Sequence, residues 1–131
     1  MAGPGNERGE AEIQTIAALR PGSTVLTGAS ATPEATLRGF DSAALVHIAA
    51  HGQHQTDNPL FSTLELSGGP LMGHDLQHLT TAPATVVLSS CDLGMAQVRP
   101  GDEALGMAAA LLSVGPAPWW RASAGSLMPP R

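Results

Sequence analysis

Two short apolar runs dominate the hydrophobic pattern of the chain, and each is followed closely by a reactive side chain. Residues 45–50 lead directly into His51, and residues 84–88 lead through two serines into Cys91. Apolar, β-branched runs of about four to eight residues that end at turn signals are typical of buried strands in a parallel sheet. The carboxyl ends of such strands meet at one crevice. The pattern therefore predicts that His51 and Cys91 come together there.

Four other segments carry helical signals. Apolar positions recur at helical spacing over residues 10–19, and a Pro-Gly pair ends that pattern. A hydroxyl, a proline and an acid at residues 32–34 are typical of a helix start, and this helix is expected to end near Gly39. Residues 74–79 predict a short helix. Residues 102–114 have the strongest helical pattern, with acids in the first turn and Gly-Pro beyond the end.

The remaining segments predict a leader, a short strand, a loop and a small hairpin outside the main sheet. Residues 1–9 are expected to form a flexible leader, and residues 24–27 a short strand. Residues 52–58 indicate a loop. Residues 60–66 alternate loosely before a Gly-Gly-Pro turn, which predicts a hairpin outside the main sheet. Helices that alternate with strands indicate an α/β fold, in which helices flank a mostly parallel sheet.

Composition narrows the classes of function. The chain has 131 residues, which is enough for one domain, and a formal net charge of −5 with only six basic residues. It has no basic stripe, so neither nucleic acid nor an anionic membrane is expected as its main partner. One cysteine excludes an internal disulfide framework. No secretory signal and no membrane-spanning apolar run are found, so a cytoplasmic location is expected.

The two reactive side chains suit nucleophilic catalysis. A thiol is a strong nucleophile only when it is ionised, and a neighbouring imidazole lowers its pKa and later supplies a proton to the leaving group. Gly52 lets its backbone approach a substrate carbonyl, and backbone donors there could form an oxyanion hole with the amide of Cys91. This pair would hydrolyse peptide bonds. Two plainer interpretations stay open: Cys91 as a small core residue, and His51 as a hydrogen-bonded structural histidine.

The other titratable side chains are expected to be structural or solvated. Because His47 and His51 are four apart on one predicted strand, they should share a face, with His47 packed beneath the site. Asp57 and Asp92 could orient the pair, although solvated loop acids are the simpler interpretation. Three further histidines are expected in solvent: His54, His74 and His78. Their spacings match no standard zinc signature, so no metal is expected.

Six segments carry a more specific pattern. In order, they are residues 47–52 (HIAAHG), 58–62 (NPLFS), 64–66 (LEL), 75–76 (DL), 86–92 (VVLSSCD) and 101–106 (GDEALG). Together they resemble the CHAT domain, a family of caspase-like cysteine peptidases usually found behind tetratricopeptide repeats. The resemblance covers roughly residues 10–115 in the order of the family.

The resemblance implies a caspase-like fold and an endopeptidase in which His51 and Cys91 form the catalytic dyad, the histidine preceding the cysteine. It implies a protein or peptide substrate, no cofactor, and a repeat-containing partner of the tetratricopeptide type. Asp92, Asp102 and Glu103 lie in matching segments. They are expected to support the site, the last two as a loop-to-helix junction beside it.

After Gly115 the pattern departs from the family, which continues with an apolar strand of the Val-Val-Ala-Ser type. Here residues 116–131 form an irregular tail that contains Trp119-Trp120-Arg121. Codons for Trp-Trp-Arg, read one nucleotide earlier, can encode Val-Val-Ala. We therefore hypothesise a frameshift near Pro116 that removed the last strands and left the Cys91 strand near an exposed edge. The alternative function is then a catalytically inactive interaction module that binds through this edge or through the tryptophans.

Overall fold

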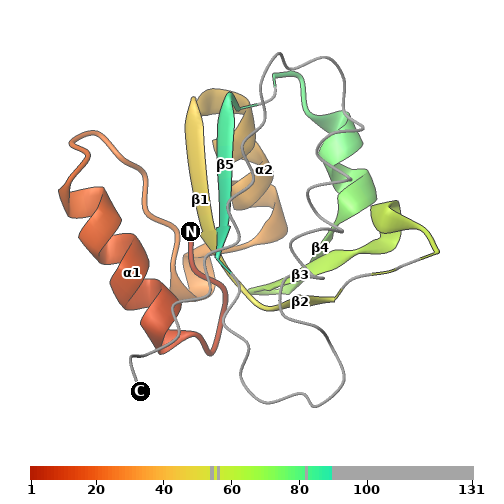
Figure 1. Ribbon diagram of the computed structural model, residues 1–131, viewed down its shortest axis with the longest axis horizontal. Coiled ribbons are helices and arrows are strands. Elements are labelled where there is room, and N and C mark those ends of the chain that lie inside the picture. The colour runs from red at the N-terminus through yellow and green to blue at the C-terminus, as the bar shows by residue number, and fades with distance from the viewer. Residues whose placement is uncertain (54, 56, 82, 90–131) are drawn as a thin grey trace, which may run out of the picture.

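A parallel pair of strands lies at the centre of the structure, a computed structural model that describes residues 1–53, 55, 57–81 and 83–89 (Figure 1). Strand β1 (Leu45–Ala49) pairs in parallel with β5 (Thr85–Ser89). Leu45 lies opposite Thr85, and Ala49 lies opposite Ser89. Both apolar runs are therefore strands, and their predicted parallel pairing is confirmed.

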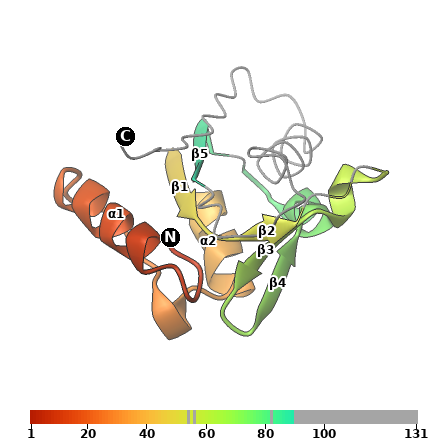
Figure 2. The same cartoon turned by 60° about the horizontal axis from the view of Figure 1, so that its bottom comes forward.

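Helix α1 (Glu7–Ala18) lies along one side of this strand pair, and α2 (Pro33–Ser42) lies on the other side (Figures 1 and 2). The helix predicted over residues 10–19 thus begins three residues early. Its start is set by Asn6, whose side chain accepts a hydrogen bond from the N–H of Gly9 at 2.8 Å. This bond satisfies one of the free donors of the first turn, where two glutamates also favour the helix dipole.

Helix α2 starts where the sequence predicted and ends later. The hydroxyl of Thr32 accepts a hydrogen bond from the N–H of Ala35 at 3.2 Å, with Pro33 at the first helical position. The helix passes through Gly39 instead of ending near it. A glycine in a helix costs only about 1 kcal/mol, and the next residue, Phe40, is almost fully buried at 1% exposure. The packing of Phe40 outweighs the local propensity for termination.

The chain between β1 and β5 forms a separate antiparallel sheet. Its strands are β2 (Gly52–Gln53), β3 (Thr63–Leu66) and β4 (Gly69–Met72), in that order across the sheet. The predicted hairpin is thus confirmed. The residues expected as a loop after His51 begin with β2, which pairs with β3.

Three short 3₁₀ helices complete the described elements. They are η1 (Gly28–Ser30), η2 (Pro59–Phe61) and η3 (Gly73–His78). The last of these confirms the short helix predicted over residues 74–79, one residue earlier at each end. Asp75 fixes its start, because a carboxylate oxygen of this residue accepts the N–H of Met72 at 2.9 Å.

The expectation of a flexible leader over residues 1–9 is wrong. Met1 and Ala2 are buried, at 8% and 1% exposure, and Ala2 forms a parallel bridge with Ala49. The first residues therefore extend the central sheet next to β1. The local sequence is rich in Gly and polar groups, but the edge of β1 supplies partners for its backbone.

The strand expected over residues 24–27 is also not formed as a regular element. This segment keeps one sheet-like bond, in which the carbonyl of Leu26 accepts the N–H of Ala2 at 2.9 Å. Residues 1–3 therefore lie between β1 and the stretch that includes Leu26. Residues 1–3 thus lengthen the parallel sheet beyond β1, which the sequence pattern did not predict.

One apolar core joins the two sheets and α2. Its largest fully buried apolar side chains, apart from a proline, are Phe40, Ile48, Leu71 and Leu76. A second, smaller cluster of Ala2, Ile13 and Ala49 holds α1 against β1. The architecture is therefore α/β, as predicted, with a parallel strand pair and a separate antiparallel sheet. Among the described residues, β5 pairs only with β1, and no helix is long and apolar enough to cross a membrane.

Candidate functional site

The register of the two central strands aligns the positions that follow them. Ala49 pairs with Ser89 at the carboxyl ends of β1 and β5. His51 comes two residues after the first strand, and Cys91 comes two residues after the second. Cys91 itself lies outside the described residues, as do Asp92, Asp102, Glu103 and the predicted helix 102–114. The structure thus confirms the aligned strand ends, and the pairing of His51 with Cys91 stays a prediction.

His51 is half-buried, and its backbone is fixed by the antiparallel sheet. Its carbonyl accepts the N–H of Glu65 in β3 at 2.7 Å. The prediction that His47 and His51 share a strand face does not hold as stated, because β1 ends at Ala49 and the chain turns toward β2. The alternation of side chains that the prediction used applies only within a regular strand.

Gly52 allows β2 to lie close to β3. It pairs with Leu64 of β3, and a Cβ atom built on Gly52 would lie only 2.5 Å from the carbonyl oxygen of Thr63. A side chain at this position would force β2 away from β3. The close approach of the two strands is therefore a reason for glycine here that does not depend on an oxyanion hole.

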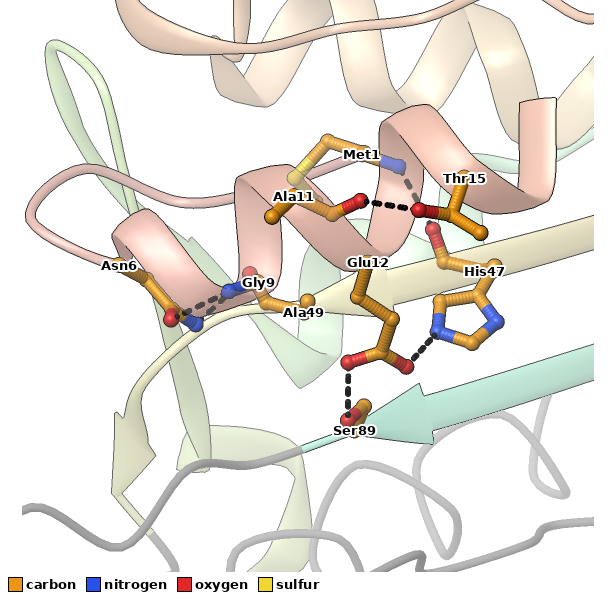
Figure 3. Close-up of polar contacts among 9 residues, drawn as sticks. All are labelled: Met1, Asn6, Gly9, Ala11, Glu12, Thr15, His47, Ala49 and Ser89. Carbon is orange, nitrogen blue, oxygen red and sulfur yellow. Dashed lines mark hydrogen bonds and ion pairs between the residues drawn. The ribbon is translucent and has the colours of Figure 1, made fainter. Parts of the chain in front are cut away.

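A polar cluster lies between α1 and the strand pair, close to the carboxyl ends of the strands (Figure 3). The Nε2 atom of His47 lies 2.8 Å from Oε1 of Glu12, and the hydroxyl of Ser89 donates to Oε2 of the same carboxylate at 3.2 Å. The side chains of His47 and Glu12 are 14% and 31% exposed. One carboxylate of α1 thus binds side chains from both β1 and β5. His47 is packed below the strand ends, as expected.

Glu12 is the residue of this cluster that sequence analysis missed. It precedes the buried Ile13, on a helix whose first turns carry several acids. An acid next to the buried stripe of a helix can face either solvent or the sheet. The local pattern does not distinguish these orientations, because the choice depends on how α1 packs against β1.

The other predicted side chains lie away from this cluster. Asp57 and His78 are exposed, as expected for solvated groups. His74 is half-exposed, lies 3.3 Å from Asp75 and packs against the ring of Phe61, so it is more enclosed than predicted. His54 lies outside the described residues. Among the residues that the structure describes, no three His, Cys, Asp or Glu side chains gather as a metal-binding group.

Comparisons with known proteins address the family of the chain. Neither the comparison with curated proteins nor the comparison with solved structures gave a match. A family model, that of the CHAT domain, matches residues 2–118. The match begins before the expected domain start at residue 10 and includes the amino-terminal segment that packs against β1. Because this match covers most of the 131 residues, the chain belongs to the CHAT domain family.

Proposed function

We propose that the chain is a CHAT-type cysteine endopeptidase domain in which Cys91 is the nucleophile and His51 the general base and acid. The observation that carries the proposal is the parallel register of Ala49 with Ser89, which gives the two residues equivalent positions after adjacent strands. Membership of the CHAT family supports the same assignment. The proposed substrate is an extended segment of a protein or peptide, presented with or without a repeat-containing partner.

The proposed reaction is acyl transfer in two steps. His51 takes the proton of the Cys91 thiol, and the thiolate sulfur attacks the scissile carbonyl carbon. Backbone N–H groups at Gly52 and Cys91 then stabilise the oxyanion. The imidazolium gives its proton to the leaving amine as the C–N bond breaks. Water, deprotonated by His51, hydrolyses the thioester and restores the thiol.

The cluster below the strand ends supports the geometry that this reaction needs. Glu12 binds His47 of β1 and Ser89 of β5, the last strand residue before the Cys91 segment. A misplacement of about 1 Å between reacting groups can cost about a hundredfold in rate. A contact that holds the two strand ends together therefore favours a working dyad.

The first test is the rate of Cys91 alkylation by iodoacetamide as a function of pH. We expect a reactive thiolate well below pH ~8.5, the ordinary pKa of a cysteine, and its loss in His51→Ala. His78→Ala is the matched control, because His78 is an exposed histidine outside the site. Cleavage of a peptide library, with Cys91→Ala as the inactive control, then identifies the specificity. A titration near ~8.5 in both the original chain and His51→Ala would contradict the proposed dyad.

The second candidate is a non-catalytic interaction module. Among the described residues, β5 is paired on one side only, and a strand edge of this kind can receive another chain. This function predicts ordinary thiol chemistry together with concentration-dependent association. Sedimentation velocity of Cys91→Ala, which cannot cross-link through the thiol, separates the two candidates.

A further inference from the structure

Two donors bind the carbonyl of Ala49, the last residue of β1. The N–H of Gly3 lies 2.9 Å from the carbonyl oxygen, and the Nδ2 atom of Asn6 lies 3.4 Å from it. Asn6 is only 4% exposed, and Ala49 is fully buried. Asn6 is therefore a buried amide that donates to the strand end from which the chain continues to His51 (Figure 3).

The oxygen of the same amide fixes the start of α1. Oδ1 of Asn6 accepts the N–H of Gly9 at 2.8 Å, which is the capping bond of the helix. A cap needs only a side-chain oxygen, and serine, threonine or aspartate supply one as well as asparagine does. Of these residues, asparagine alone carries a separate N–H donor beside the capping oxygen. The side chain of Asn6 thus joins the first turn of α1 to the end of β1, a contact that helix capping does not require.

Gly9 allows this junction to close. A Cβ atom built on Gly9 would lie 2.5 Å from Nδ2 of Asn6 and 2.9 Å from the Cβ of Ala49. A side chain at this position would displace the amide or push the first turn of α1 away from β1. The first turn therefore lies directly on the strand end, and close packing of this kind transmits a movement of the turn to Ala49.

The backbone of His51 lies between two fixed points. On one side is the Ala49 carbonyl, which Asn6 binds. On the other side, the carbonyl of His51 itself accepts the N–H of Glu65 in β3 at 2.7 Å. The one residue between these points, Ala50, is buried at 2% exposure. Because each residue has only two soft backbone dihedrals, anchors this close together constrain the direction of the His51 side chain.

Helix α1 also holds the end of the second strand. Further along the helix, Oε2 of Glu12 accepts the hydroxyl of Ser89 at 3.2 Å. Ser89 is the last residue of β5 and precedes Cys91 by two positions. Two polar side chains of one helical segment therefore contact the two strand ends, each at a place two residues before a member of the proposed dyad.

We propose that Asn6 is a positioning residue of the peptidase, which sets the strand end before His51 as Glu12 sets the strand end before Cys91. This inference rests on the proposed function and adds that α1, which supplies no reacting group, controls the distance between imidazole and thiol. A misplacement of about 1 Å between reacting groups can cost about a hundredfold in rate. A contact that only supports the backbone can therefore have a large effect on turnover.

Two variants remove the amide donor and keep a capping oxygen: Asn6→Asp and Asn6→Ser. Gln14→Glu is the matched control, because it makes the same amide-to-carboxylate change at an exposed position of α1. For a cleaved peptide, we expect both Asn6 variants to lower kcat about tenfold or more and to leave KM within about twofold. The control should leave both constants unchanged. Urea unfolding verifies that each variant is folded, and Asn6→Ser decides the result if a buried carboxylate prevents Asn6→Asp from folding.

The pH profile of Cys91 alkylation separates positioning from a structural role. In the Asn6 variants we expect the pKa of the thiol to move toward ~8.5, the ordinary value for a cysteine, as in His51→Ala. The profile of Gln14→Glu should match that of the original chain. A lower urea midpoint of the Asn6 variants with an unchanged alkylation profile and an unchanged kcat would overturn the proposal. A thiol that titrates near ~8.5 already in the original chain would overturn the peptidase assignment and this inference with it, so the two failures are distinguishable.

Discussion

The carboxylate of Glu12 lies 2.8 Å from the Nε2 atom of His47, and this contact joins a helix to the central strand of the domain (Figure 3). The second oxygen of the carboxylate accepts the hydroxyl of Ser89 at 3.2 Å, so the same group reaches β5. His47 precedes His51 by four residues, and Ser89 precedes Cys91 by two. The relative placement of the two strand ends therefore depends in part on Glu12, which is distant from both strands in the sequence.

Glu12→Gln is expected to destabilise the fold by about 1 kcal/mol, because it keeps the shape of the side chain and weakens a charge-assisted contact that is partly exposed. Urea unfolding measures this as a lower midpoint with an unchanged slope. Glu65→Gln is the control, since Glu65 is exposed on β3. Equal midpoints for the two variants would show that the carboxylate does not join helix and strands. A slower alkylation of Cys91 in Glu12→Gln alone would extend its effect to the site.

Gly52→Ala is expected to destabilise the domain by about 1–3 kcal/mol, because the new methyl group would lie 2.5 Å from the carbonyl oxygen of Thr63. Gly39→Ala is the matched control. It adds the same methyl group in open space on α2 and should raise stability by up to about 1 kcal/mol. Thermal unfolding compares the two. If Gly52→Ala unfolds like the original chain and yet loses peptide cleavage, the glycine serves the substrate and not the sheet.

Stability is expected to rise with pH between about 6 and 8. Burial lowers the pKa of the Met1 amino group in the folded chain from 8.0 to about 6. In this range the unfolded state binds more protons than the native state, so raising the pH favours the native state. Since the amino group is partly exposed to screening by solvent, we expect a gain of about 1 kcal/mol. Urea midpoints across this range measure it, and Met1-acetylated protein should lack the gain. An equal pH slope after acetylation would assign the gain to another titratable group.

Asp41→Ala is expected to lower stability by about 1 kcal/mol. A carboxylate oxygen of Asp41, near the end of α2, accepts the N–H groups of Thr80 and Thr81 at 2.8 and 2.9 Å. These bonds fix the segment that leads into β5. Asp57→Ala serves as the control because Asp57 is an exposed loop acid. Equal denaturation midpoints for the two variants would show that water replaces the bonds without cost.

Local signals were sufficient for most elements. A cap residue and a proline at residues 32–34 predict the start of α2, and two apolar runs predict β1 and β5. Each of these signals determines the structure of residues only a few positions away, so it can be read from one segment of the sequence alone. The predictions failed where a distant partner decides the outcome. Residues 1–3 bind the edge of β1, and residues 24–27 contribute one bond to Ala2 and no regular strand.

The candidate site shows the same division. The sequence by itself determined the parallel strand pair, the family and the position of His51 after its strand, because apolar runs and short motifs are properties of neighbouring residues. Only the tertiary structure decided that Glu12 joins His47 and Ser89, that Gly52 is required by β3, and that Asn6 joins α1 to the end of β1. Each of these features depends on how separate segments dock, and docking is set by the total packing of the core and not by any single stretch of the chain.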